Sequence, residues 1–151
     1  YKDAISLINN NGLDTVIKQH IKQGKYLLGI CLGHQLLFKR SIHERAYKGL
    51  SLLKGEVKKI NNPLRKKSPV GWKSISTKPV PIFRDFNNSQ YMYFFDKYHI
   101  KCPERFVIAH FEYCGNRFAT AVQKKNIIGI QFLPEKSGNA GLKILKSFGE
   151  L

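Results

Sequence analysis

The chain has 151 residues, 42% of them hydrophobic, and carries a formal net charge of +16 at neutral pH. That length predicts a single domain over residues 1–151, and no apolar run reaches the roughly 18 residues that a membrane-spanning helix needs. The odd number of cysteines, three, and the lack of a secretory apolar region favour a reducing compartment and predict a cytoplasmic location.

Helical and strand-like patterns alternate along the first part of the chain. Apolar residues at helical spacing predict an amphipathic helix over 13–21 that ends near Gly24. The apolar run 26–30 has the length of a buried strand, and 34–40 has helical spacing again. These patterns predict a helix, a strand and a second helix in succession.

The remainder of the chain is rich in predicted strands. Apolar runs separated by turn residues indicate strands over 56–60, 72–77, 91–98, 106–113, 118–122 and 127–132. A closing amphipathic helix is expected over 140–148. We therefore expect a three-layer α/β domain with a mixed central sheet, and an active site at the carboxyl ends of its strands.

Cys31 lies at the junction of the strand 26–30 and the helix after it, in the sequence GICLGHQ. Gly29 and Gly33 flank it at two positions on either side, which predicts the sharp turn of a nucleophile elbow. The helix N-terminus is expected to favour the thiolate, and the N–H of Leu32 to point at an oxyanion. A buried structural cysteine between packing glycines is the open alternative.

No metal or cofactor site is predicted. The cysteines Cys31, Cys102 and Cys114 form no CxxC pair, and the five histidines form no HxxxH or HExxH spacing.

The basic charge leaves three explanations open. Lysine, asparagine and isoleucine are abundant together, as in 58–62, which is typical of an AT-rich coding bias. A nucleic-acid surface is less favoured, because lysines are scattered, only 65–67 form a short run, and no nucleic-acid motif is present. The basic surface could also meet an acidic partner or a phosphorylated substrate.

GICLGHQ resembles the GxCxGxQ signature of class I glutamine amidotransferases. In that family the cysteine attacks the side-chain amide of L-glutamine, which the resemblance assigns to Cys31. The resemblance also implies a substrate-binding role for Gln35 and for the elbow residues Gly29, Leu32 and Gly33, within a flavodoxin-like fold.

Four further segments, 67–75, 91–100, 118–132 and 134–148, resemble one branch of the family in their order and spacing. This branch comprises the glutaminase subunits of imidazole glycerol phosphate synthase in histidine biosynthesis. The resemblance covers nearly the whole chain. It implies a heterodimer in which ammonia passes to a cyclase subunit, a (β/α)8 barrel, with no cofactor in the glutaminase.

The chain departs from the family at the catalytic base. The family's QFHPEKS motif carries the histidine that activates the cysteine, and here Leu133 stands in its place. Glu135, which would orient that histidine, remains. Leucine cannot accept the thiol proton or donate one to departing ammonia, so we expect glutaminase turnover to be absent or residual.

Two other departures concern the substrate pocket and the start of the domain. The family's PH and HS pairs read Pro69-Val70 and Asp96-Lys97 here, which alters the predicted substrate-binding segment. The chain begins at Tyr1, and its opening residues resemble the middle of the family pattern. We therefore expect the first strands and the glycine-rich loop with a second oxyanion N–H to be missing.

A partner interface is implied around Pro69, Trp72 and Lys136. In the two-subunit enzyme the proline–glycine turn faces the cyclase barrel, and a large aromatic anchor such as Trp72 suits an interface. An ordinary aromatic at the rim of the core is the alternative for Trp72.

Three functions remain open on the sequence. The first is a glutaminase subunit with Cys31 as nucleophile, with His99 as the first candidate for a substitute base. The second is an inactive module that docks a cyclase-like barrel or a sugar-amidination enzyme. The third is a basic nucleic-acid-binding protein.

Overall fold

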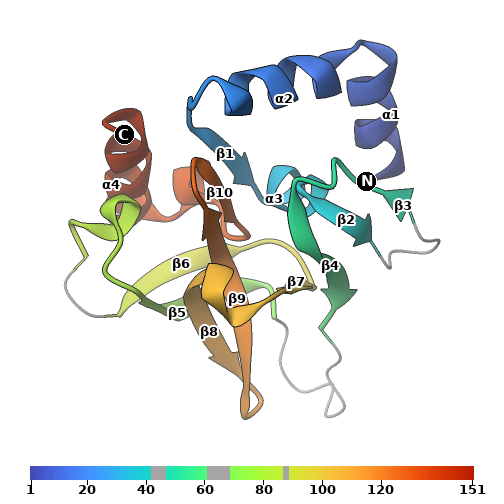
Figure 1. Cartoon of the computed structure of the whole chain (residues 1–151). Coiled ribbons are helices and arrows are strands. Elements are labelled where there is room, and N and C mark those ends of the chain that lie inside the picture. The colour runs from blue at the N-terminus through green and yellow to red at the C-terminus, as the bar shows by residue number, and fades with distance from the viewer. Residues whose placement is uncertain (42–46, 61–68, 87–88) are drawn as a thin grey trace.

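The computed structural model describes residues 1–41, 47–60, 69–86 and 89–151, and Figure 1 shows the arrangement of the elements. The helices are α1 (Lys2–Asn10), α2 (Leu13–Lys22), α3 (Leu32–Leu36) and α4 (Gly138–Gly149), with short 3-10 turns η1 (Pro81–Phe83), η2 (Glu104–Phe106) and η3 (Pro134–Lys136). The strands are β1 (Leu27–Ile30), β2 (Phe38–Ser41), β3 (Tyr47–Lys48), β4 (Leu53–Lys59), β5 (Gly71–Thr77), β6 (Gln90–Phe94), β7 (Tyr98–Lys101), β8 (Val107–Tyr113), β9 (Asn116–Lys124) and β10 (Ile127–Ile130).

The strands form one mixed sheet. Eight of them follow the order β3-β2-β4-β7-β9-β8-β5-β6, and β10 joins the sheet through β9 and carries β1 on its other side. The β1–β10 and β2–β4 pairs are parallel, and the other pairs are antiparallel. The predicted α/β fold with a mixed central sheet is confirmed.

Two hydrophobic clusters pack on the two faces of the sheet around β10. Ile128 and Ile130 belong to a cluster that includes Phe132 and Ile144 of α4, whereas Ile127 belongs to a cluster with Leu37. Neighbouring residues of a strand point to opposite faces, so β10 contributes to both clusters. Figure 1 shows α4 on one side of β1 and β10, with α1 and α3 on the other.

The prediction of a helix over 34–40 is wrong for its second half. The helix α3 ends at Leu36, and Phe38–Ser41 forms β2, which pairs with β4. The N–H groups of Leu52 and Leu53 donate to the carbonyl of Leu37, at 2.9 and 3.0 Å, and so draw this segment into the sheet. Long-range pairing overrides local helical spacing here.

The single strand expected over 91–98 is also wrong, because it is two strands. The strand β6 ends at Phe94 and β7 begins at Tyr98. Between them the chain bends at Lys97, where the Asp96 carboxylate accepts the N–H of Lys97 at 2.6 Å. Helix α1 was not predicted from the sequence at all.

The basic run 65–67 lies outside the described residues, so its predicted role stays a prediction. Within the described ranges, no helix is long and apolar enough to cross a membrane.

The packing of α4 onto η3 gives a matched pair of glycine substitutions. A Cβ at Gly141 would overlap the Pro134 carbonyl, whereas one at Gly149 in the same helix would meet nothing within 4 Å. We expect Gly141→Ala to lower the free energy of unfolding by about 1–3 kcal/mol through this overlap. Gly149→Ala should be neutral or gain up to about 1 kcal/mol in helix propensity. Urea denaturation checks both, and equal effects would contradict the packing described.

Candidate active site

Cys31 sits at a strained corner between β1 and α3. Its φ is 50° and its ψ is −105°, outside the usual range for a residue with a side chain. The Cys31 N–H donates to the carbonyl of Ile130 at 2.8 Å, and the Cys31 carbonyl accepts the N–H of Gln35 at 3.1 Å. This is the geometry expected of a nucleophile elbow, and the adjacent end of β10 holds it in place.

Gly29 is required at this corner because the chain folds back closely on itself. A Cβ at Gly29 would lie 2.8 Å from the Gly33 carbonyl oxygen. His34, which follows Gly33, is fully buried, and its ring nitrogens have no hydrogen-bond partner among the described residues. Burial lowers the pKa of His34 to about 3, so this side chain is neutral and packs against Phe38 at a ring distance of 5.5 Å.

Two glutamine side chains connect the sulfur of Cys31 to Asp96. The Gln131 Nε2 amide donates to Cys31 Sγ at 3.8 Å. The Gln35 Nε2 amide donates to Asp96 Oδ2 at 2.7 Å and to Gln131 Oε1 at 3.5 Å. The structure thus brings together three predicted site residues, Cys31, Gln35 and Asp96. The sequence motif assigned no role to Gln131, the first residue of the segment QFLPEKS over 131–137.

The expected thiolate at Cys31 is a wrong prediction, because the pKa of this thiol is raised. Burial is the main cause, the Asp96 charge is the second, and Glu135 adds a smaller effect of the same sign. The N–H of Leu32 acts the other way and lowers the pKa. Helix α3 has only five residues and does not offset the burial.

The segment after β10 is held by backbone contacts to β6. The Leu133 N–H donates to the Tyr93 carbonyl at 2.9 Å, and Ser137 Oγ donates to the Leu133 carbonyl at 2.6 Å. Ser137 Oγ also accepts the Tyr93 N–H at 3.0 Å. Leu133 is half-buried, and Glu135 is exposed with no hydrogen bond to any described residue.

The residues predicted at a partner interface are only partly exposed. Trp72 on β5 is 53% exposed and packs edge-on against Tyr93 at a ring distance of 5.8 Å. Lys136 Nζ lies 5.6 Å from the centre of the Phe95 ring. Pro69 is buried. We call the exposed residues Trp72, Tyr91, Phe95 and Lys136 the aromatic surface; three of them lie on or next to β5 and β6.

The described contacts of His99 lie on β4 and β9, not at Cys31. It pairs with Lys58 across β4 and β7, and its ring contacts Phe118 at 4.9 Å. No described interaction joins it to Cys31. Among the described residues, no group of three or more histidine, cysteine, aspartate or glutamate side chains could hold a metal ion.

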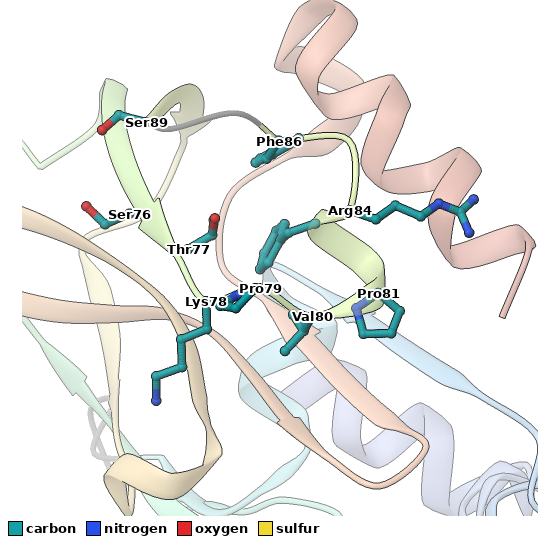
Figure 2. A pocket seen from close by; sticks show the side chains of 10 residues that line it. Ser76, Thr77, Lys78, Pro79, Val80, Pro81, Arg84, Phe86 and Ser89 are labelled. Atoms are coloured by element: carbon teal, nitrogen blue, oxygen red, sulfur yellow. The ribbon is translucent and has the colours of Figure 1, made fainter.

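A cavity of about 750 Å³ lies apart from Cys31, between the end of β5 and η1. In Figure 2 the Arg84 side chain extends toward the C-terminal helix and Lys78 extends away from the other lining residues. Arg84 forms an ion pair with Glu150. The charged lining groups are therefore engaged or directed elsewhere, and the cavity holds none of the predicted catalytic residues.

A family model described as glutamine amidotransferase class-I matches residues 10–150. The chain belongs to the class I glutamine amidotransferase family. The family resemblance predicted from GICLGHQ is therefore confirmed, and the elbow at Cys31 lies inside the matched region.

Relatives in this amidotransferase family match nearly the whole chain. It is 38% identical over 149 residues to imidazole glycerol phosphate synthase subunit HisH of Chlorobaculum tepidum, covering 97% of this chain and 74% of that protein. It is 42% identical over 154 residues to the HisH subunit of Caldanaerobacter subterraneus subsp. tengcongensis, covering 100% of this chain and 74% of that protein.

Solved amidotransferase structures share the fold. A glutamine amidotransferase from Thermotoga maritima superposes with a TM-score of 0.61 at 18% sequence identity, covering 93% of this chain and 54% of that one. This likeness supports the fold alone.

The raised pKa predicts slow and pH-dependent alkylation of Cys31. At neutral pH the folded chain holds less thiolate than an ordinary cysteine, so iodoacetamide should modify Cys31 with a midpoint above that of the same residue in urea-unfolded chain. Peptide mass spectrometry separates Cys31 from Cys102 and Cys114. A folded midpoint at or below the unfolded one would contradict the burial and charge described.

Proposed function

We propose that this chain acts as a glutaminase subunit of the imidazole glycerol phosphate synthase type, in histidine biosynthesis. The observation that carries the proposal is the strained turn at Cys31, which lies beside the segment QFLPEKS over 131–137. Support also comes from relatives at about two-fifths identity that are named HisH subunits. L-Glutamine is the proposed substrate.

In the proposed reaction Cys31 Sγ bonds to the side-chain amide carbon of glutamine, and the C–N bond then breaks. The nitrogen leaves as ammonia after gaining a proton, and water hydrolyses the thioester to glutamate. The Leu32 N–H is proposed to stabilise the oxyanion. Asp96, Lys97 and Gln35 are proposed at the substrate pocket, although Gln35 is only 2% exposed and so acts from beneath it.

The same chemistry explains why this chain's own turnover is proposed to be absent or residual. At residue 133 the leucine side chain can neither take the thiol proton nor protonate the leaving nitrogen. The raised pKa of Cys31 compounds this, since less thiolate is present without a base. Loss of the base from a nucleophile–base pair cost on the order of 10⁶ in kcat in a serine protease.

This deficit favours a second candidate, an inactive module that docks a cyclase-like barrel or a sugar-amidination enzyme. The aromatic surface is proposed to make the contact in either case. Exposed aromatic side chains of this size suit the centre of a protein interface. Pro69 is buried and is proposed to support this surface from below.

Restoring the base tests the glutaminase proposal. In a mixture with a cyclase subunit from a relative, we expect Leu133→His to raise glutamate release from glutamine by at least about 10²-fold, the lower range of general acid–base effects. A coupled glutamate assay measures the rate, and Leu133→His with Cys31→Ala is the control that must stay silent.

The outcomes separate the two candidates. Turnover only with Leu133→His supports a glutaminase that lacks its base. If neither version turns over while the chain still binds the cyclase, the docking module is favoured. Turnover in the parent chain would contradict the role given to Leu133.

Binding to the cyclase subunit tests the aromatic surface. We expect Trp72→Ala to weaken association at least about tenfold, because truncating a central aromatic anchor commonly costs about 1–2 kcal/mol or more. Tyr26→Ala is the matched control, since Tyr26 is an exposed aromatic immediately before β1 and outside this surface. Isothermal titration calorimetry measures both, and equal losses would refute the placement of the interface.

A further inference from the structure

We propose that Asp96 is a positioning residue that determines which end of the Gln131 amide faces the sulfur of Cys31. The consequence for catalysis rests on the proposed nucleophilic role of Cys31, but the alkylation experiment that tests the positioning needs no turnover. The resemblance places Asp96 where the family's HS pair has its histidine, so a carboxylate at this position is particular to this chain.

The two glutamines have few alternatives to the contacts they make. Gln35 and Gln131 are each 2% exposed, so water cannot readily replace their partners. A buried amide that loses its partner costs free energy, and its orientation is therefore set by the groups around it. Gln35 contacts Asp96 and Gln131, and Gln131 contacts Cys31.

The carboxylate of Asp96 fixes the orientation of the first amide. An ionised Asp96 can only accept hydrogen bonds, so Gln35 must turn its NH₂ group toward it. This contact, at 2.7 Å, is the shortest of the three and is charge-assisted. The other oxygen of Asp96 accepts the Lys97 N–H at 2.6 Å, which holds the carboxylate itself in place.

The second amide carries this orientation to the sulfur. With the Gln35 NH₂ group fixed, its second hydrogen points at Gln131 Oε1, at 3.5 Å. The Gln131 NH₂ group must then face Cys31 Sγ, at 3.8 Å. If Gln131 turned over, its carbonyl oxygen would face the sulfur and would repel a thiolate.

Asp96 therefore acts on the thiol in two opposed ways. Its negative charge disfavours the thiolate through space, as does that of Glu135. Through the two amides it holds a hydrogen-bond donor at the sulfur, which favours the thiolate. These effects can be separated because only the second requires Gln131.

The experiment is a double-mutant cycle on the full 151-residue chain. The pH midpoint of Cys31 alkylation by iodoacetamide is measured for the parent, Asp96→Asn, Gln131→Met and the double variant. Asparagine keeps the shape of residue 96 but can present either end of its amide, so orientation is no longer enforced. We expect Asp96→Asn to lower the midpoint by about 0.3–1 pH unit more in the Gln131→Met background than in the parent.

Glu135→Gln provides the matched control. It also removes a negative charge that acts on Cys31, but no described hydrogen bond joins Glu135 to either glutamine. Its effect on the midpoint should be the same with and without Gln131→Met. This result would show that the difference found for Asp96 does not arise from a general change in the site.

Equal effects of Asp96→Asn in the two backgrounds would overturn the proposal. If Gln131→Met does not fold, as judged by circular dichroism, Gln35→Met replaces it. This variant breaks the connection between Asp96 and Gln131 and carries the same expectation. If Asp96→Asn acts differently in the two backgrounds but Leu133→His releases no glutamate, the proposed function is contradicted and this inference stands. If Asp96→Asn acts equally in the two backgrounds and Leu133→His does release glutamate, this inference is overturned and the proposed function stands.

Discussion

The parallel pairing of β1 with β10 is the constraint on which the rest of the site depends. Ile30 lies opposite Ile130, so the next residues, Cys31 and Gln131, leave the sheet side by side. The hydrogen bond from the Cys31 N–H to the Ile130 carbonyl, 2.8 Å long, extends this pairing to the turn itself. Two segments a hundred residues apart in the chain thus meet at one point. Hydrophobic packing on both faces of β10 holds the pair, since its residues contribute to both clusters.

The electrostatics of this point are set by the groups around the sulfur. Burial and two carboxylates raise the pKa of Cys31, and the Leu32 N–H opposes them without prevailing. A neighbouring histidine in its charged form would favour the thiolate, but the nearest histidine along the chain, His34, is buried and neutral. The elbow therefore supplies shape and strain for a nucleophile, while its surroundings favour the neutral thiol.

Sequence patterns predicted the features that depend on neighbouring residues. The glycines around Cys31, the apolar run of β10 and the helix α4 were all evident locally, and the family resemblance came from short motifs. The strand β2 was not, because Phe38–Ser41 continues a segment with helical spacing and becomes a strand by pairing with β3 and β4. The raised pKa of Cys31 was not predictable either, because its main cause, burial, and its second cause, the charge of the distant Asp96, arise only in the folded chain. The contact between Gln131 and the sulfur likewise forms only in the folded chain, across a hundred residues of sequence.

At residue 133 the backbone atoms hold the segment in place, whereas any catalysis would depend on the side chain. The segment after β10 is fastened through the backbone N–H and carbonyl of Leu133, which contact Tyr93 and Ser137. Neither contact uses the side chain of residue 133, so the position of the segment does not depend on which side chain residue 133 carries. Gln35 and Gln131 likewise hold their places through contacts to Asp96 and to each other. The fold thus does not require a base at residue 133, because the hydrogen bonds that position this residue come from its backbone.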